Sequence, residues 1–163
     1  MASIKLTRGG EEIARKLEEL SQAGEAIGKM AVYDGAKVIA DGIRASINSL
    51  PVDTPRHLRS GERFGVIVRQ DKEDLANGLG IAEIKRDEDG VKTVIGFAGY
   101  GRHKTKKYKN GYPIAMLARS VESGSSVRQP HPFVQPAVQA KRKAAKAEMI
   151  KTGDKAIKNI TKG

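Results

Sequence analysis

Histidine and carboxylate side chains are the groups in this chain that could hold a metal, and their spacing argues against it. The three histidines, His57, His103 and His131, lie in segments rich in Pro, Arg and Lys. None of them has a second His or a carboxylate at the spacing of metal ligands. The acidic run at 87–89 lacks the spaced ligands and distal Glu of a calcium loop, and a hairpin turn explains it better. We therefore predict neither a metal nor another cofactor.

Nucleophiles and phosphate-binding turns give equally weak signals. Serines gather in ESGSS at 122–126, but the Gly-x-Ser-x-Gly frame of a nucleophile elbow is missing. GYGR at 99–102 lacks the third glycine and the helix start of a dinucleotide-binding turn. The chain has no cysteine, which excludes disulfides, thiolate metal sites and cysteine nucleophiles. These observations predict a protein that is not an enzyme.

Basic residues are the strongest compositional feature. The sequence holds 30 Lys and Arg against 19 Asp and Glu, a formal net charge of +11. The segment 102–109, RHKTKKYK, contains no acid, and 141–163 is rich in Lys. Such an excess attracts polyanions, nucleic acid above all, although it also suits a solvated surface or an acidic protein partner. No helix-turn-helix, zinc-finger or RNP motif predicts that bases are recognised.

The basic segment 102–109 supplies the candidate binding residues. Tyrosines at 100, 108 and 112 flank or interrupt it, and such an arrangement can contact a phosphate backbone and stack on bases. The alternative is an exposed loop whose tyrosines pack against their own domain. The residues that we expect to face DNA or an acidic partner are Arg102, Lys104, Lys106 and Lys107.

Hydrophobic periodicity predicts the helices that flank these motifs. We expect a first helix from about residue 9 to 20, a break at 21–24, and a longer helix over 25–48 with one buried stripe. Prolines at 51 and 55 end that helix, and 51–65 is expected to be a flexible loop. A short helix follows Asp71, another is expected at 114–121, and the last at 134–160. Whether this last helix projects from the domain is left open.

Alternating apolar and polar residues predict a β-hairpin between the helices. GLGIAEIK at 78–85 and VKTVIGF at 91–97 are β-prone runs joined by RDEDG, whose Asp and Gly residues suit a turn. The segment 99–113 is expected to be a flexible loop or an extended hairpin. The fold class is therefore α+β: a small antiparallel sheet packed against long helices, with a long C-terminal helix.

Length and hydropathy limit the organisation of the chain. Its 163 residues suit a single domain, 1–163. The N-terminus has no apolar segment typical of a secretory signal, and no apolar run approaches the roughly 18 residues of a membrane span. We expect a soluble protein that does not associate with membranes.

The order of the motifs, more than any single motif, resembles a known family. DLANGLGIAEI, VIGFAGYG, the Lys-rich KTKKY, LARSVESGSSVRQ and HPFVQPA follow one another. This order is similar to that of the head–tail joining (tail-completion or neck) family of long-tailed phages and prophages, exemplified by the gene-ten product of HK-type phages. The resemblance extends from about residue 13 to 155 and is strongest over 74–137, whereas 51–65 does not align.

The resemblance implies a virion structural protein of the phage neck, assembled in the host cytoplasm. Its subunits would form a homo-oligomeric ring, usually sixfold, at the head-proximal end of the tail. There the ring would complete the tail and join it to the head, contacting other neck, tail-tube and terminator proteins, while genomic DNA passes without sequence specificity through the lumen.

The proline-framed segment before the last helix is the expected subunit contact, because preset proline angles lower the entropy lost on ordering. The candidate interface residues are Val121, Glu122, Ser123, Gly124, Pro132 and Phe133. The competing function is a free, basic nucleic-acid-binding protein of prophage origin, which would bind duplex DNA with a steep salt dependence.

Overall fold

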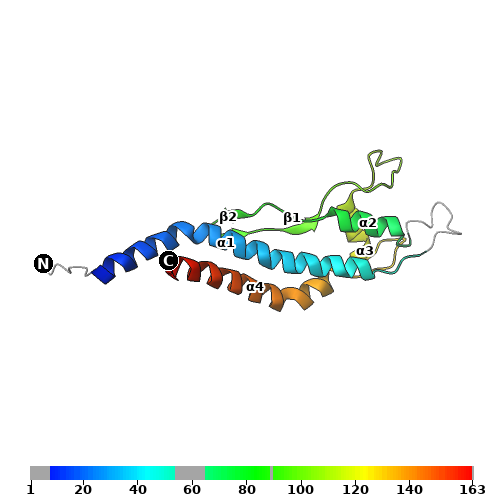
Figure 1. Cartoon of the computed structure of the whole chain (residues 1–163). Coiled ribbons are helices and arrows are strands. Elements are labelled where there is room, and N and C mark those ends of the chain that lie inside the picture. The colour runs from blue at the N-terminus through cyan, green and yellow to red at the C-terminus, as the bar shows by residue number, and fades with distance from the viewer. Residues whose placement is uncertain (1–7, 54–64, 89, 163) are drawn as a thin grey trace.

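The longest element is a helix that runs along almost the whole molecule. The computed structural model describes residues 8–53, 65–88 and 90–162. Within them α1 (Arg8–Ser49) is followed by α2 (Arg69–Gly78), α3 (Ile114–Ser123) and α4 (Val134–Lys162). Figure 1 shows α4 beside α1, the strands along another side of α1, and α2 with α3 gathered at one end. The predicted loop 51–65 lies largely outside the described residues.

The predicted break at 21–24 is wrong, because α1 continues through it. A glycine inside a helix costs about 1 kcal/mol relative to alanine, which a long helix can absorb when tertiary packing supports it. The support here comes from α4, whose end reaches this half of α1: the Lys16 ammonium donates to the carbonyl of Thr161 at 2.9 Å.

Close antiparallel packing of α1 and α4 depends on glycines. A Cβ added to Gly35 would lie 2.4 Å from Cγ of Met149, and one added to Gly42 would lie 2.6 Å from Cγ of Lys141. The Thr152 hydroxyl donates to Asp34 at 2.7 Å across the same seam. The sequence leaves open whether the last helix projects from the domain. In the structure α4 packs along α1.

The predicted hairpin forms, but as two short antiparallel pairs. Strand β1 (Leu79–Ile81) pairs with β4 (Ile95–Phe97), and β2 (Lys85–Asp87) pairs with β3 (Gly90–Lys92). The register shifts by one residue between the two pairs: Ile81 lies opposite Ile95, and Lys85 lies opposite Lys92. The N-terminal arm of the hairpin therefore carries one residue more than the C-terminal arm. Such a bulge bends a ribbon and increases its twist. The α+β prediction is confirmed.

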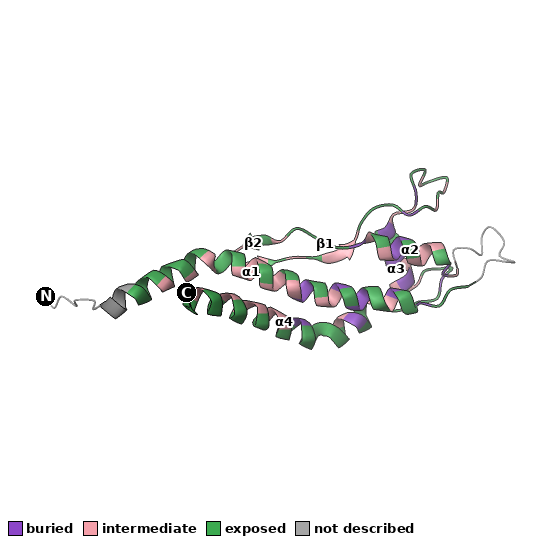
Figure 2. Cartoon of the chain, viewed as in Figure 1, coloured by how far each residue is buried: buried purple, intermediate pink, exposed green. Residues whose placement is uncertain are grey.

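The hydrophobic core lies at the end where α2 and α3 meet the C-terminal part of α1. Figure 2 shows the buried residues concentrated there, while the opposite half of the α1–α4 pair is mostly exposed. Phe97 and Phe133 meet edge to face with ring centroids 5.9 Å apart. The core consists of Ile43, Ile47, Leu50, Ile67, Leu75, Leu79, Ile114, Leu117, Ala118, Val121, Phe133 and Ala137. The segments that carry the candidate residues are anchored on this core.

Candidate functional site

Segment 99–113, which holds the basic candidates, is a hairpin with hydrogen-bonded arms. The N–H of Gly101 donates to the carbonyl of Tyr112 at 2.8 Å, and the N–H of Tyr112 donates to the carbonyl of His103 at 2.7 Å. Nearer the tip, the N–H of Thr105 donates to the carbonyl of Tyr108 at 3.1 Å. We call residues 99–113 the basic hairpin. It stands out from the body beside α2 and α3 (Figure 1).

Arg102 fixes the base of the basic hairpin to α2. Its Nε donates to Asp74 at 3.0 Å and its Nη2 donates to Glu73 at 2.7 Å, while its backbone N–H donates to Asp74 at 3.0 Å. The bonds from Arg102 lower the pKa of Glu73, and those to Glu73 and Asp74 raise the pKa of Arg102. A Cβ on Gly101 would lie 2.6 Å from Oδ2 of Asp74, so a larger residue there would displace the carboxylate that holds Arg102.

The predicted charge cluster therefore divides into two parts. Arg102 is engaged by two carboxylates of its own chain, so its charge is already compensated. Lys104, Lys106 and Lys107 are exposed, as is Lys109. In the described part of the chain no acidic group pairs with these four lysines. The tip lysines thus differ from Arg102, which is exposed but shares its charge with two carboxylates of its own chain.

The tyrosines of the basic hairpin also divide. Tyr108 and Tyr112 pack edge to face with centroids 5.3 Å apart, and Nζ of Lys107 lies 5.5 Å from the centre of the Tyr108 ring. Tyr100 is 66% exposed. Packing against the chain itself, one of the two alternatives from the sequence, thus describes Tyr108 and Tyr112 but not Tyr100.

Two of the candidate interface residues, Val121 and Phe133, have buried side chains. Their exposed fractions are 0% and 2%, because both side chains pack in the core of their own chain. Their side chains therefore contribute to the core of this chain, and the interface prediction at these two positions stays untested. The prolines around Phe133 suggest that the segment between α3 and α4 is exposed, whereas its apolar side chains point into the core.

Glu122 has a structural role that its position in the sequence does not reveal. Its carboxylate accepts the N–H groups of Phe133, Val134 and Gln135 at 2.7, 2.8 and 3.0 Å. These are the otherwise unpaired donors at the start of α4, so Glu122 caps that helix from 11 residues away in the chain. Burial acts to raise the pKa of Glu122, but the three N–H bonds outweigh burial and the pKa lies below its usual value.

Of the remaining interface candidates, Glu122, Ser123 and Pro132 line one open groove, and Gly124 does not. Gly124 ends α3 with a φ of 77°, a left-handed conformation that favours glycine. Ser123 and Pro132 are exposed and, with part of Glu122, line a groove of about 450 Å³. The other walls come from α1, β1, β4, α3 and the first turn of α4. This groove is the part of the predicted interface that a neighbour can reach.

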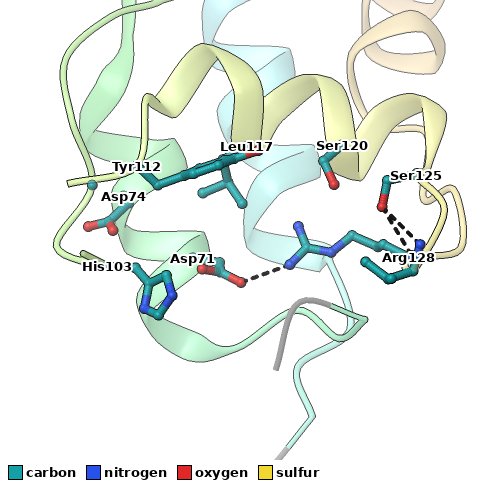
Figure 3. A pocket seen from close by; sticks show the side chains of 10 residues that line it. Asp71, Asp74, His103, Tyr112, Leu117, Ser120, Ser125 and Arg128 are labelled. Atoms are coloured by element: carbon teal, nitrogen blue, oxygen red, sulfur yellow. Dashed lines mark hydrogen bonds and ion pairs between the residues drawn. The ribbon is translucent and has the colours of Figure 1, made fainter. Parts of the chain in front are cut away.

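A smaller cavity of about 190 Å³ lies under the base of the basic hairpin. Its main charged contact joins Arg128, 5% exposed, to Asp71 at 3.3 Å, and Arg128 also donates to the carbonyl of Val66 at 2.8 Å. Figure 3 shows Ser120 and Ser125 on one side of this pair and His103 on the other. The arrangement ties the segment before α2 to the segment after α3.

A metal cluster and a membrane-spanning helix each have requirements that the described residues can be compared with. Within 8–53, 65–88 and 90–162, no group of three or more His, Asp or Glu side chains has a geometry that could hold a metal ion. Among the same residues no helix is long and apolar enough to cross a membrane. His57 lies outside the described residues.

The fold and these surfaces define a class: an α+β protein with a long helical pair, a core at one end and a basic hairpin fixed beside it. The family model described as "Bacteriophage HK97-gp10, putative tail-component" matches residues 11–124, more than two thirds of the 163 residues. The chain belongs to this family. No curated protein and no solved structure matches the chain. The family assignment makes it a phage tail component, and it confirms the resemblance found in the sequence.

Proposed function

We propose that this protein forms a homo-oligomeric ring, sixfold by the resemblance, at the head-proximal end of the phage tail. The ring completes the tail and joins it to the head, and genomic DNA passes through its lumen. Its partners are other copies of the chain and other neck, tail-tube and terminator proteins. It assembles in the host cytoplasm and remains in the virion. The family assignment supports the tail location, and the finer role rests on the geometry below.

The basic hairpin is the observation that carries this proposal. An arm that stands out from one subunit and meets a different surface on the next makes a head-to-tail contact, and such contacts close into rings when the rotation permits. The arm must keep its direction to specify one rotation. The bonds of Arg102 to Asp74 and Glu73 fix that direction at the base, while the lysines at the tip are exposed.

The open groove beside Ser123 and Pro132 supplies the kind of receiving surface that such a contact needs. Its walls contain the apolar residues Ile95, Phe97 and Val134, and the exposed Arg119 also lines it. Interfaces combine an apolar centre with a polar rim, and this groove has both. The net charge of +11 suits a ring that surrounds DNA, since a lumen of opposite sign does not repel the genome.

Electron microscopy of particles made without this protein tests the proposal. We expect separate heads and tails, or tails with aberrant ends, and recovery when the gene is supplied in trans. Normal joined particles would refute the role in joining. The competing function, a free nucleic-acid-binding protein, predicts instead that purified particles lack the chain.

A charge variant tests the contribution of the basic hairpin. Lysines at its tip are replaced by Gln while Arg102 is kept, so the hairpin stays anchored. We expect fewer infectious particles from a subunit that folds normally, as judged by circular dichroism and thermal melting. An unchanged titre would contradict a role for the tip. The tip residues are Lys104, Lys106 and Lys107, and the matched control replaces Lys37, Lys85 and Lys143.

A further inference from the structure

The side of α4 that faces away from α1 carries a row of lysines. Lys151, Lys155, Lys158 and Lys162 stand at i, i+4, i+7 and i+11, which places them on one helical face, and all four are exposed. Thr152, whose hydroxyl bonds to α1, lies on a different side of the helix, next to the half-buried residues Met149, Ala156 and Ile160. We call these four residues the lysine ridge. At 1.5 Å per residue it covers about 16 Å of the helix.

The lysine ridge is unfavourable for the helix that carries it. From Val134 to Lys162 the chain has eight basic residues and two acidic ones, a net charge of 8 − 2 = +6. Within the described residues the one ion pair of α4 joins Lys151 to Glu148 at 3.1 Å. Like charges at i and i+4, such as Lys158 and Lys162, destabilise a helix. For Lys155, Lys158 and Lys162 no ion pair within the described residues offsets this cost, and such an uncompensated local cost is typical of a surface that serves an external partner.

The chemistry around the ridge favours phosphate over protein as that partner. A shallow, open depression of about 610 Å³ runs along it, lined by the four lysines, Ala147, Ile150, Asp154 and Asn159. Cores of protein interfaces are enriched in aromatic residues, Met and Arg and depleted of Lys, and this depression has the reverse composition. Lysine ammonium groups act as point charges on flexible stems, which suits phosphate oxygens and carries no information about sequence.

We propose that the lysine ridge binds the phosphate backbone of duplex DNA without base specificity. The inference deepens the proposed function, on which it rests for the source of the DNA, because it assigns the outer face of α4 to the lumen. It leaves the protein contacts of the proposed function to the basic hairpin, which unlike the ridge combines its lysines with tyrosines. The two basic surfaces of the chain, which the sequence could not distinguish, then have different partners.

Two variants with equal charge test the ridge in the full-length protein. One replaces the four ridge lysines by Gln, and the other replaces Lys104, Lys106, Lys107 and Lys109 by Gln. Each lowers the net charge by four, from +11 to +7. Lys and Gln have similar helix propensities, so α4 should persist, and circular dichroism checks this. A labelled 30-base-pair duplex is titrated at several salt concentrations, and binding is followed by fluorescence anisotropy.

We expect the ridge variant to lose most of the salt dependence of binding. Each phosphate that a lysine neutralises contributes about 0.9 to the slope of log K against log salt, so removing four such lysines lowers the slope by about 3 to 4. The hairpin variant should change it by less than about 1. Equal losses in both variants would overturn the proposal, because they would report net charge alone. An unchanged slope in the ridge variant would overturn it too.

An acidic protein partner for the ridge predicts a different pattern. Wild-type protein would then fail to bind the duplex, while the ridge variant would fail to sediment with purified tails, and this outcome also overturns the inference. The DNA titration uses the purified chain alone, so its result is independent of the role in joining. If particles without the protein show unjoined heads and tails while the ridge variant still binds DNA normally, only the inference about the ridge is refuted.

Discussion

The cap that Glu122 places on α4 makes a quantitative prediction about stability. Replacing Glu122 by Ala leaves three N–H groups at the start of α4 without their acceptor. Loss of a helix cap costs about 1 kcal/mol, and hydrogen bonds to a charged group exceed neutral ones, so we expect a loss of about 2 kcal/mol. For a domain of this size 1 kcal/mol corresponds to about 2–4 °C, and the melting temperature should fall by about 4–8 °C.

The same contact should make stability depend on pH. Because the folded-state pKa of Glu122 is depressed, its stabilising contribution is complete above the ordinary value of 4.5 and is lost as the pH falls through the lower folded-state pKa. Thermal melting of wild type and Glu122→Gln between pH 7 and pH 3 measures this. The difference between them should shrink as the pH falls through that range.

Glu83 offers a matched control for this experiment. It is an exposed carboxylate for which no partner is found in the described parts of the chain. Glu83→Gln should leave the melting temperature and its pH dependence unchanged. If Glu122→Ala melts like wild type at pH 7, or if Glu122→Gln keeps the full acid sensitivity of wild type, the capping argument is wrong.

The other predictions concern the helix seam, the buried ion pair and the base of the hairpin. Gly35→Val should destabilise the protein by about 1–3 kcal/mol in urea unfolding, because its side chain would meet Met149. Gly24→Ala, whose Cβ meets nothing, should stabilise it by about 0.5–1 kcal/mol. Equal effects of the two substitutions would contradict close packing of α1 on α4 at Gly35. Arg128→Met should cost about 3–5 kcal/mol, since it leaves the carboxylate of Asp71 without its buried partner, and a cost below that of a surface substitution would refute this role. Arg102→Gln should speed amide hydrogen exchange within 99–113 without unfolding the core, and unchanged exchange would show that Arg102 does not anchor the hairpin.

Much of the fold can be predicted because it follows from local pattern. The last two helices are predicted to within about two residues, since apolar periodicity and prolines mark their limits. The alternating runs on either side of RDEDG predict the hairpin correctly. Continuity of α1 through 21–24 cannot be predicted in this way, because it depends on support from α4, more than a hundred residues later.

The candidate sites are harder to predict because their contacts join distant segments. In the sequence Arg102 resembles any other exposed basic residue. It anchors the basic hairpin only because Asp74 of α2, 28 residues earlier, lies beside it in the fold. Glu122 and Arg128 stand in a polar stretch that suggests a surface, yet one caps α4 and the other is buried against Asp71. A carboxylate shortly before a proline-framed helix start is a signal that could have pointed to the cap.

The position of the core at one end of α1 gives the molecule a gradient of local stability. At 1.5 Å per residue α1 is about 63 Å long, and the large buried side chains contact only its C-terminal third. Farther along, the α1–α4 pair has fewer buried side chains and is joined by the contact of Met149 with Gly35 and a few polar bonds, so we expect this end to open at lower free energy than the core. If this end of the α1–α4 pair opens while the core stays folded, it can adapt its conformation to a surface that it contacts. Binding at this end would then order the two helix ends. Part of the binding free energy would be used for that ordering, so assembly and the folding of this end would be coupled.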